Sequence, residues 1–307
     1  MLKLALSIVA VSLLALSLIP GPARAQPARV FVAAQGSDAN SCSFALPCRT
    51  FQHAHDVVAA GGEIDVLDPA GYGILTITKS ISIQGHGFAG IAAGSGTTAI
   101  TANAPLLSTI NLRGLLIDGV GTGSIGISMI ANTAIMNIQD SMIRNFTTRA
   151  IDVQGGQLFV TNTVISDSSL AVQLTAGAGI LAKFSRVSMI NSSGISAIDT
   201  GGSTNEIDVT VADSDIGNFG GGSGVACFSN SATMCIMVRN STISGYAAGN
   251  GIFAHGGLCT IYVTRSTITQ NGTGLNPTSG ASLNSFGDNS VAGNATDGTP
   301  TGTIALK

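Results

Sequence analysis

The sequence predicts an all-β solenoid, and more narrowly a single-stranded parallel β-helix with a short capping helix at its N-terminal end. Three observations lead to this fold class. A Ser/Thr-x-aliphatic motif recurs between residues 110 and 281, a second apolar position follows each copy, and Gly, Asn or Asp comes after each motif at nearly the same place. A β-rich repeat of about 20 to 30 residues is typical of a solenoid in which each repeat makes one coil.

The repeated motifs supply the predicted core. Apolar and polar residues alternate within them, as in Ile261-Tyr262-Val263-Thr264, which is the pattern of a strand with one buried face. The first anchors are Ile117, Ile143, Ile165, Val187, Ile216, Ile243 and Ile268, and the second anchors are Ile127, Ile151, Val172, Ile198, Val225, Ile252 and Leu275. Each strand is then expected to pair in parallel with its counterpart one coil on, about 4.8 Å away.

The residues that follow each motif predict the corners between strands. Gly, Asn and Asp tolerate a left-handed backbone better than other residues. One of them stands shortly after each first anchor, at Gly119, Asn145, Asp167, Asn191, Asn218, Gly245 and Asn271. A second corner position is marked by Asp140, Asn162, Asp213 and Asn240. We therefore expect every coil to bend at the same phase, with polar side chains stacked along each corner.

The two ends of the chain differ from the repeats. Residues 1–25 combine a basic start, an apolar run and Ala23-Arg24-Ala25, which is the pattern of a cleaved secretory signal peptide. Residues 26–62 are predicted to form a strand-loop-helix cap, with the helix running from Thr50 to Ala60. Coils of the β-helix are expected over residues 63–281, and a closing coil and tail over residues 282–307. The leader predicts export to the periplasm or the outside of the cell.

The composition narrows the classes of partner. Charged residues make up 9% of the chain, and the net charge is -3. Nucleic-acid binding needs clustered Lys and Arg, which this chain lacks, so no nucleic-acid partner is expected. No later apolar run is long enough to span a bilayer, so no membrane insertion is expected after the signal peptide is removed.

The five cysteines agree with export to an oxidising compartment. Cys42 and Cys48 are close enough in sequence to close a small ring, and Cys227 and Cys235 bracket a polar loop. Each couple is predicted to form a disulfide. Cys259 is left over, one coil beyond Cys235 at nearly the same phase, so a Cys235–Cys259 bridge is the rival pairing.

The two ends of the chain also resemble a known family. Val30-Phe31-Val32, Gly36-Ser37-Asp38 and the run from Pro47 to Gln52 resemble the first segment of exported right-handed parallel β-helix proteins of the pectate-lyase-like superfamily, many of them uncharacterised bacterial secreted proteins. The tail from Ser285 to Ile304 is similar to their closing coil. This resemblance implies the fold and its right-handed sense. It implies no single activity, because the superfamily holds lyases, hydrolases, adhesins and inert scaffolds.

One outward column offers candidate catalytic residues. The residue after each second anchor is expected to face outward, which aligns Asp152 and Asp199 two coils apart with Gln173 between them. Two carboxylates at about 9–10 Å would lie near the upper limit for an inverting glycoside hydrolase. A solenoid must also place polar residues outward for solubility, and this plainer interpretation is the stronger one. Gln173, Arg149 and Phe253 are the candidates for ligand binding.

Cofactor chemistry has little support in the sequence. The histidines are scattered and no CxxC pair exists, so no metal site is predicted. Ca²⁺ is the alternative, because Ca²⁺-dependent lyases occur among the proteins that the chain resembles. Asp208, Asp213 and Asp215 form the densest acidic group, and a turn role is the default for Asp213.

These observations favour a secreted, non-enzymatic β-helix protein that binds a polysaccharide or another cell-surface partner along its polar face. The alternative is a polysaccharide lyase or glycoside hydrolase that acts on an acidic polysaccharide through Asp152 and Asp199.

Overall fold

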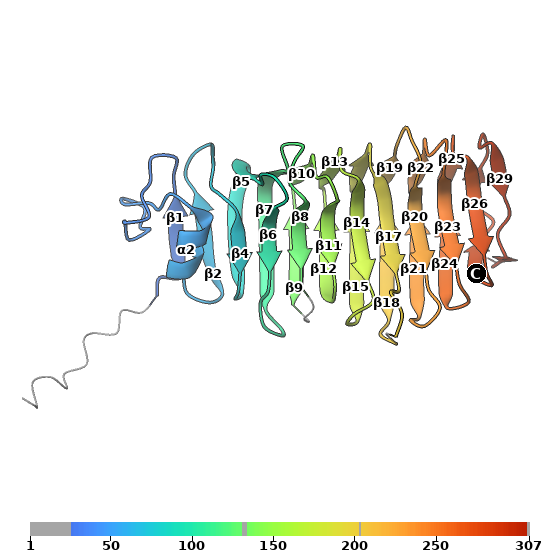
Figure 1. The fold of residues 1–307 in the computed structure, drawn as a ribbon, viewed down its shortest axis with the longest axis horizontal. Helices are drawn as coiled ribbons and strands as arrows, with labels where there is room; N and C mark the ends of the chain where they lie inside the picture. Colours follow the sequence, from blue (N-terminus) through green and yellow to red (C-terminus); the bar gives the residue numbers. More distant parts are fainter. Residues whose placement is uncertain (1–25, 131–133, 203, 306–307) are drawn as a thin grey trace, which may run out of the picture.

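The computed structural model describes residues 26–130, 134–202 and 204–305, so the predicted signal peptide at 1–25 lies outside the described residues. The described chain is a parallel β-solenoid. Its coils stack into an elongated body, and the chain enters at one end of the stack and finishes at the other (Figure 1). The predicted all-β solenoid is therefore confirmed.

Each coil of the repeat region contributes three strands, and each strand pairs in parallel with the strand three positions later. One strand of every coil joins a ten-stranded sheet, and the other two join a twenty-stranded sheet that has a long row and a short row. The ten-stranded sheet contains β4 Leu75–Ile77, β6 Thr98–Ala102, β8 Ile125–Met129, β11 Arg149–Val153, β14 Leu170–Thr175, β17 Ser193–Ile198, β20 Ser223–Phe228, β23 Asn250–His255, β26 Thr273–Thr278 and β29 Thr296–Gly298.

The twenty-stranded sheet wraps the remaining sides of the solenoid. Its long row contains β1 Arg29–Val32, β2 Gly62–Val66, β5 Ile81–Ala92, β7 Thr109–Asp118, β9 Ile135–Gln139, β12 Gly156–Thr161, β15 Ile180–Ser185, β18 Ile207–Ala212, β21 Met234–Arg239, β24 Cys259–Thr264, β27 Ser282–Ser285 and β30 Gly302–Thr303. Its short row contains β3 Ala70–Gly71, β10 Met142–Arg144, β13 Val164–Ser166, β16 Ser188–Ile190, β19 Asp215–Gly217, β22 Thr242–Ser244, β25 Thr267–Thr269 and β28 Ser290–Val291. Strands β5 and β7 run through both rows.

The predicted anchors stack into buried columns, with one coil as the exception. In the short row, Ile165 pairs with Ile143 before it and with Met189 after it, so Met189 and not Val187 is the first anchor of that coil. In the ten-stranded sheet, Val172 pairs with Ile195, so Ile195 and not Ile198 is the second anchor. Val187 is also buried, and it lies two residues from Met189 on the same face of the chain, which is why periodicity alone did not separate them.

The small residue before each second anchor has a packing reason. At Gly224 an added Cβ would lie 2.3 Å from Cγ2 of Ile243 and 2.8 Å from the carbonyl oxygen of Gly251. The strand of the ten-stranded sheet therefore approaches the first-anchor column too closely for a larger side chain. This contact joins the two sheets around one continuous core.

The corners confirm the left-handed backbone at most predicted places. Among the first corner residues, φ is 63° at Asn145, 53° at Asp167, 52° at Asn191 and 82° at Gly245. The second corner is left-handed at Asp140, Asn162, Asp213 and Asn240. Gly119, Asn218 and Asn271 do not have this conformation, and Gln270 has it in place of Asn271 with φ 59°.

The stacked corner side chains bond as amide and carboxylate pairs. Asn191 Nδ2 donates to Asp167 Oδ1 at 2.9 Å, and Asn162 Nδ2 donates to Asp140 Oδ1 at 2.7 Å. Each pair joins two successive coils, so the corner residues serve both the turn and the stacking.

The predicted helix is present but shorter than expected. Helix α2 spans Phe51–Val57, and the hydroxyl of Thr50 accepts a hydrogen bond from the backbone N–H of His53 at its start. It lies at the N-terminal end of the stack (Figure 1) and buries Phe51 and Ala54. Its role as a cap and the right-handed sense of the coils stay predictions. No helix within the described ranges has the length and apolar character needed to cross a membrane.

Candidate functional site

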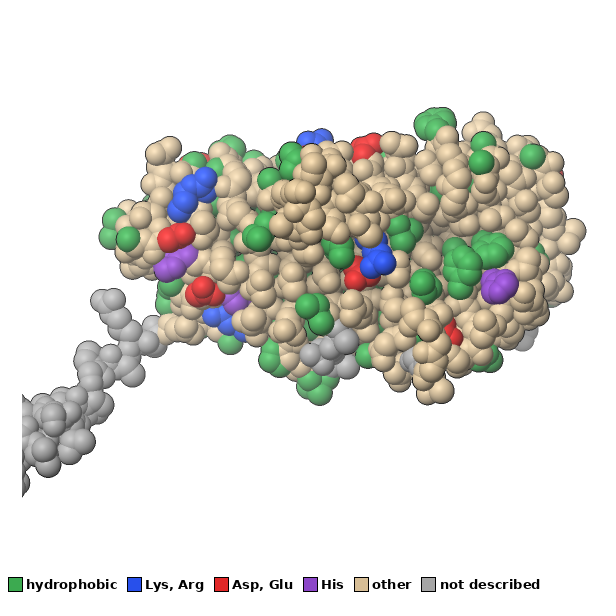
Figure 2. All heavy atoms as spheres, viewed as in Figure 1, with side chains coloured by type: hydrophobic (Ala, Val, Ile, Leu, Met, Phe, Trp, Pro, Cys, Tyr) green, Lys and Arg blue, Asp and Glu red, His purple; other side chains and the backbone are tan. Residues whose placement is uncertain are grey.

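The outer face of the ten-stranded sheet brings together most of the predicted site residues. Strand pairing sets the column as Ser128, Asp152, Gln173, Ser196, Ala226, Phe253 and Asn276. The face turned to the viewer in Figure 2 carries an acid beside a base near its middle and a hydrophobic patch with a histidine toward the C-terminal end. These two features are the ends of the candidate site.

The charged end is an ion pair within strand β11. Arg149 Nη1 lies 3.0 Å from Asp152 Oδ1, and Gln154 Nε2 donates to Asp152 Oδ2 at 3.2 Å. The Asp152 side chain is only 3% exposed, whereas that of Arg149 is 30% exposed. Both carboxylate oxygens are therefore engaged by protein donors, and the part of the pair that a ligand can reach is the guanidinium group of Arg149.

Asp199 does not join this column, which corrects the sequence alignment. Gln173 pairs with Ser196, and Asp199 comes after the last residue of β17. With about 3.3 Å per residue along a strand and about 4.8 Å between strands, its Cα lies roughly 14 Å from that of Asp152. The predicted Asp152–Gln173–Asp199 column is wrong, because the second anchor of this coil was misassigned by three residues.

Asp199 instead joins two loops. Its carboxylate accepts hydrogen bonds from the backbone N–H groups of Gly201 at 2.8 Å, Ser231 at 2.8 Å and Ala232 at 3.3 Å, and from the hydroxyl of Ser231. These donors, with the Ser231 hydroxyl first, lower the pKa of Asp199 to about 2. A carboxylate whose oxygens accept this many local hydrogen bonds holds the two loops together, and this is a structural role.

The aromatic end is a cluster of three rings. Phe253 packs on Phe228 with a centroid distance of 5.1 Å and stacks on His255 at 6.1 Å with an interplanar angle of 19°. His255 Nδ1 lies 3.0 Å from Thr278 Oγ1, which orients the imidazole. Only Phe253 was predicted from the sequence. The other two rings follow from the register, which pairs Phe228 with His255 in adjacent strands.

A hollow separates the charged end from the aromatic end. It measures about 250 Å³ and is lined by Leu170, Ser193, Ser196, Gly222, Ser223, Ala226 and Phe228. Most of these side chains are small, so the outer surface of the sheet is recessed between the charged end and the aromatic end. Asp152 and Phe253 are four strands apart, which gives a span of about 19 Å. The face therefore has the length and relief to hold an extended ligand that crosses several strands.

The cysteines pair differently from the prediction in one of two cases. Cys42 and Cys48 form the predicted disulfide. Cys227 bonds to Cys259 and not to Cys235, which has a free thiol. The register explains this, because Cys259 pairs with Met234 and Cys235 pairs with Thr260. Cys235 is thus one residue out of phase and points outward, while Cys227 and Cys259 are both buried.

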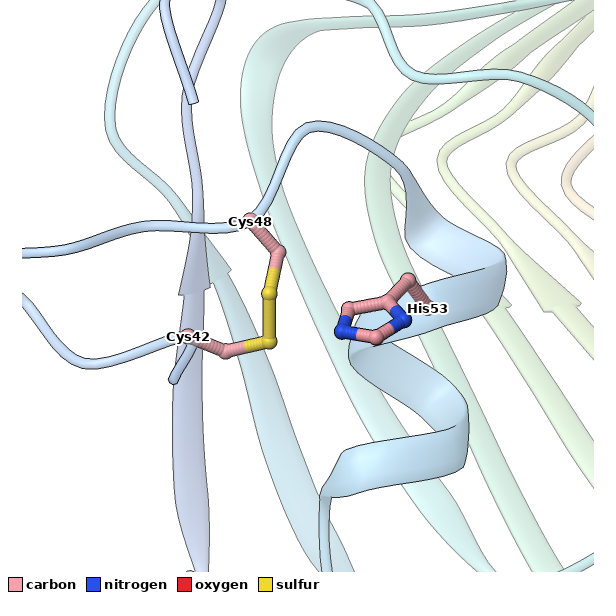
Figure 3. A group of neighbouring side chains, drawn as sticks. All are labelled: Cys42, Cys48 and His53. Atoms are coloured by element: carbon pink, nitrogen blue, oxygen red, sulfur yellow. A yellow bond between two sulfur atoms is a disulfide. The ribbon is translucent and has the colours of Figure 1, made fainter. Parts of the chain in front are cut away.

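The acidic residues that the sequence singled out for Ca²⁺ do not come together in the described part of the chain. Asp213 is a left-handed corner residue that accepts from Asn240 Nδ2 at 2.6 Å, while Asp208 and Asp215 lie on the different strands β18 and β19. The metal-ligating atoms that lie within 4.8 Å of one another in the described part belong to Cys42, Cys48 and His53. Figure 3 shows that the two sulfur atoms of this group are bonded to each other, so they are unavailable as thiolate ligands.

Comparison with known proteins identifies the fold class. No protein-family model matches the chain, and no curated protein matches its sequence. The structure is similar to the crystal structure of pectate lyase Pel9A, with a TM-score of 0.62 and 15% identity over 84% of this chain and 74% of that chain. A rhamnogalacturonan lyase matches with a TM-score of 0.30 and 13% identity over 84% and 73% of the two chains, which is too weak to support an argument.

The chain therefore has a pectate-lyase-like parallel β-helix fold, and the resemblance seen in the sequence is confirmed at the level of the fold. At 15% identity this likeness does not transfer an activity, because one fold hosts many functions.

Proposed function

We propose that this chain is an exported, non-enzymatic β-helix protein that binds a polysaccharide, such as a cell-surface glycan, along the outer face of the ten-stranded sheet. The observation that carries the proposal is the arrangement of this face, where the Arg149–Asp152 pair and the ring cluster lie at opposite ends of a shallow hollow. A right-handed coil, with α2 covering its first turn, is part of the same proposal.

The chemistry of the two ends suits sugars. Aromatic rings offer flat apolar surfaces with little conformational entropy to lose, and Phe228, Phe253 and His255 together make such a platform. Binding sites need a few placed polar groups to fix orientation, and Arg149 and Gln173 supply N–H donors at the other end. The Ser-lined hollow between them leaves room for a chain of linked rings.

A non-enzymatic role is favoured by the state of the carboxylates. Glycoside hydrolysis needs two carboxyl groups on either side of the scissile bond, at most about 9.5 Å apart. Asp152 is buried in its ion pair, and the Asp199 carboxylate, three residues beyond the column, is occupied by hydrogen bonds from loop backbone. Neither group is placed to act as an acid or base on a ligand that lies across the sheet.

Export is supported by the disulfides and by the leader. Disulfides persist in oxidising compartments, and this chain has Cys42–Cys48 and Cys227–Cys259. Together with the predicted signal peptide at residues 1–25, they favour a periplasmic or extracellular location.

The binding proposal is tested by measuring affinities for the glycan that the protein prefers. The full-length sequence is expressed in an exporting host, and the purified protein is screened on a glycan array. Calorimetry then compares the wild type with Phe253→Ala and with Tyr262→Ala, a matched aromatic control on the outer side of the long row. We expect Phe253→Ala to weaken binding at least about fivefold and Tyr262→Ala to leave it unchanged.

Two outcomes would contradict this proposal. One is an array on which no glycan binds. The other is an equal loss of affinity in the Phe253 and Tyr262 variants, which would show that the glycan does not bind specifically to the outer face of the ten-stranded sheet.

The alternative is a polysaccharide lyase or glycoside hydrolase that acts on an acidic polysaccharide. The observation in its favour is the fold shared with a pectate lyase. Incubation with uronic-acid polymers, followed by assays for unsaturated products and for new reducing ends, discriminates between the two functions. If activity is found and survives Asp152→Asn combined with Asp199→Asn, then the chain is an enzyme whose site lies elsewhere.

A further inference from the structure

The N-terminal loop and helix α2 bring together three side chains that the proposed function does not use. The Sγ atoms of Cys42 and Cys48 and a ring nitrogen of His53 lie within 4.8 Å of one another. Figure 3 shows the imidazole beside the disulfide, with one ring nitrogen turned toward the sulfur atoms. Thiolate sulfur and imidazole nitrogen are ligands that Zn²⁺ prefers. The cluster therefore has the composition of a zinc site whose sulfur atoms are held in a disulfide.

Backbone hydrogen bonds place both cysteines independently of the bond between their sulfur atoms. The carbonyl oxygen of Cys42 accepts from the N–H of Phe31 at 2.8 Å, and the N–H of Cys48 donates to the carbonyl oxygen of Phe31 at 2.9 Å. The carbonyl oxygen of Cys48 accepts in turn from the N–H of Ala33 at 3.0 Å. Since both cysteines are tied to the edge of the same strand, β1, reduction of the disulfide leaves the two thiols close together.

A separate set of hydrogen bonds places His53. Its backbone N–H donates to Thr50 Oγ1 at 3.2 Å, and the Thr50 hydroxyl donates to Asp38 Oδ2 at 2.8 Å. Asp38 Oδ1 also accepts from the backbone N–H groups of Arg49 and Thr50. Asp38 belongs to the loop that carries the two cysteines, so the first turn of α2 is anchored to that loop. The imidazole is thus presented to the sulfur atoms from a fixed backbone position.

The ring of His53 is available to a ligand, whereas the other histidine of α2 is not. The described part of the chain provides no hydrogen-bond partner to the ring nitrogens of His53. In His55, by contrast, Nδ1 lies 3.2 Å from Asp56 Oδ1 and Nε2 accepts from the N–H of Thr78 at 3.2 Å. His53 is also partly exposed, while the two cysteines are buried. A metal ion would therefore reach the buried sulfur atoms from the imidazole side.

The charge balance suits a divalent cation at this buried position. Two thiolates neutralise one Zn²⁺, so the bound group brings no net charge into the protein, and an uncompensated charge there would be costly. Three protein ligands would leave one tetrahedral position for water, on the exposed side of His53.

From this geometry we propose that the reduced form of the chain binds Zn²⁺ through Cys42, Cys48 and His53, and that the metal and the disulfide are alternative states of one site. A thiol reductant supplies two electrons and two protons to the S–S bond and is itself oxidised to a disulfide, which leaves two thiols on the protein. Binding of Zn²⁺ then releases the two thiol protons. The site is separate from the ten-stranded sheet, so this inference does not depend on the proposed function.

Co²⁺ absorption spectroscopy tests the site, because Zn²⁺ is spectroscopically silent and Co²⁺ bound to thiolates in its place has charge-transfer and visible bands. The full-length exported protein is reduced with dithiothreitol, freed of the reductant without exposure to air, and titrated with Co²⁺. We expect the reduced protein to show both bands and Zn²⁺ to remove them. The oxidised protein is expected to show neither band.

Three variants establish which residues hold the metal. Cys42→Ser is expected to lose the bands at Co²⁺ concentrations that saturate the wild type. His53→Ala is expected to weaken Co²⁺ binding at least about tenfold. Cys227→Ser is the matched control, because it removes one thiol of the other disulfide, and it is expected to bind Co²⁺ like the wild type. Circular dichroism of each reduced protein checks that the β-solenoid is intact.

Several results would overturn the inference. The first is a reduced wild type without the bands, and the second is a Cys42→Ser variant that keeps them. Unchanged affinity in His53→Ala would show that the imidazole is not a ligand, and loss of binding in Cys227→Ser would place the metal at the other cysteine pair. A reduced wild type that loses its β-strand spectrum would contradict the placement of the ligands by backbone hydrogen bonds. Failure to bind any glycan bears on the proposed function alone.

Discussion

Substitutions at Ile165 and at its neighbour Val164 test the assignment of inward-facing residues in a coil. Ile165 lies in β13, is fully buried, and pairs with Ile143 on one side and Met189 on the other. Its neighbour Val164 belongs to the same strand, is half-buried and points to the opposite side. Replacing either residue by Asp introduces the same charge at two adjacent positions of one strand.

The two substitutions should differ by several kcal/mol. Ile165→Asp loses the burial of an isoleucine side chain, which is worth about 2 kcal/mol. It also adds an unpaired carboxyl group to an apolar column, which costs at least about 2 kcal/mol more. A domain has a free energy of unfolding of only about 5–15 kcal/mol, so this loss of at least about 4 kcal/mol is a large part of it. Val164→Asp keeps its charge near water and should cost less than about 1 kcal/mol.

Urea unfolding followed by far-UV circular dichroism measures the difference. A solenoid can unfold coil by coil, so transition midpoints are compared instead of extrapolated free energies. The midpoint of Ile165→Asp should fall well below those of the wild type and of Val164→Asp. Equal midpoints for the two variants would show that the assigned inward face of β13 is wrong.

Three further predictions concern the disulfide, a loop and the buried ion pair. Cys227→Ser removes a disulfide worth about 3 kcal/mol and should lower the urea midpoint clearly, whereas Cys235→Ser should leave the midpoint near that of the wild type, because of these two cysteines only Cys227 is bridged. The pKa of Asp199 is lowered from 3.8 to about 2, so its ionised form stabilises the fold above about pH 4. The stability advantage of the wild type over Asp199→Asn should therefore shrink as the pH falls toward 2, as thermal unfolding at several pH values would show. Arg149→Met should cost about 2 to 3 kcal/mol in thermal unfolding by leaving Asp152 buried without its partner, and Asp152→Leu in the same chain should restore most of that loss.

The β-solenoid fold could be predicted from the sequence because every coil repeats the same pattern of residue types. Buried aliphatics recur at one phase, and left-handed corners select Asn, Asp and Gly, as at Asn145, Asp167 and Asn191. The exact strand pairing was less accessible. In the coil with Val187 and Met189 both residues are buried, and only the hydrogen-bonded register shows which of them stacks on Ile165.

The consequence of such a register error depends on whether the shift is by an even or an odd number of residues. A shift by two residues leaves the face unchanged, so choosing Val187 cost nothing. A shift by an odd number exchanges inside and outside. Choosing Ile198 for Ile195 placed Asp199 in the wrong column, and aligning Cys235 with Cys259 placed an outward thiol opposite a buried one.

The candidate site was therefore only partly predictable. Arg149, Asp152 and Gln173 lie together as expected, because their strands belong to well-aligned coils. Phe228 and His255 were missed because their meeting depends on the pairing of two strands and on no local motif.

The central claim is that a polysaccharide binds across the ten-stranded sheet, and the imidazole of His255 tests it most directly. His255 stacks on Phe253 at the aromatic end of the face, so a bound sugar must change its surroundings. Titration with the glycan that binds best on the array should shift the His255 signal in proportion to occupancy measured by calorimetry, and Phe253→Ala should move this titration to glycan concentrations at least about fivefold higher. Tight binding that leaves the His255 signal unmoved would contradict the account, because the glycan would then lie on another face.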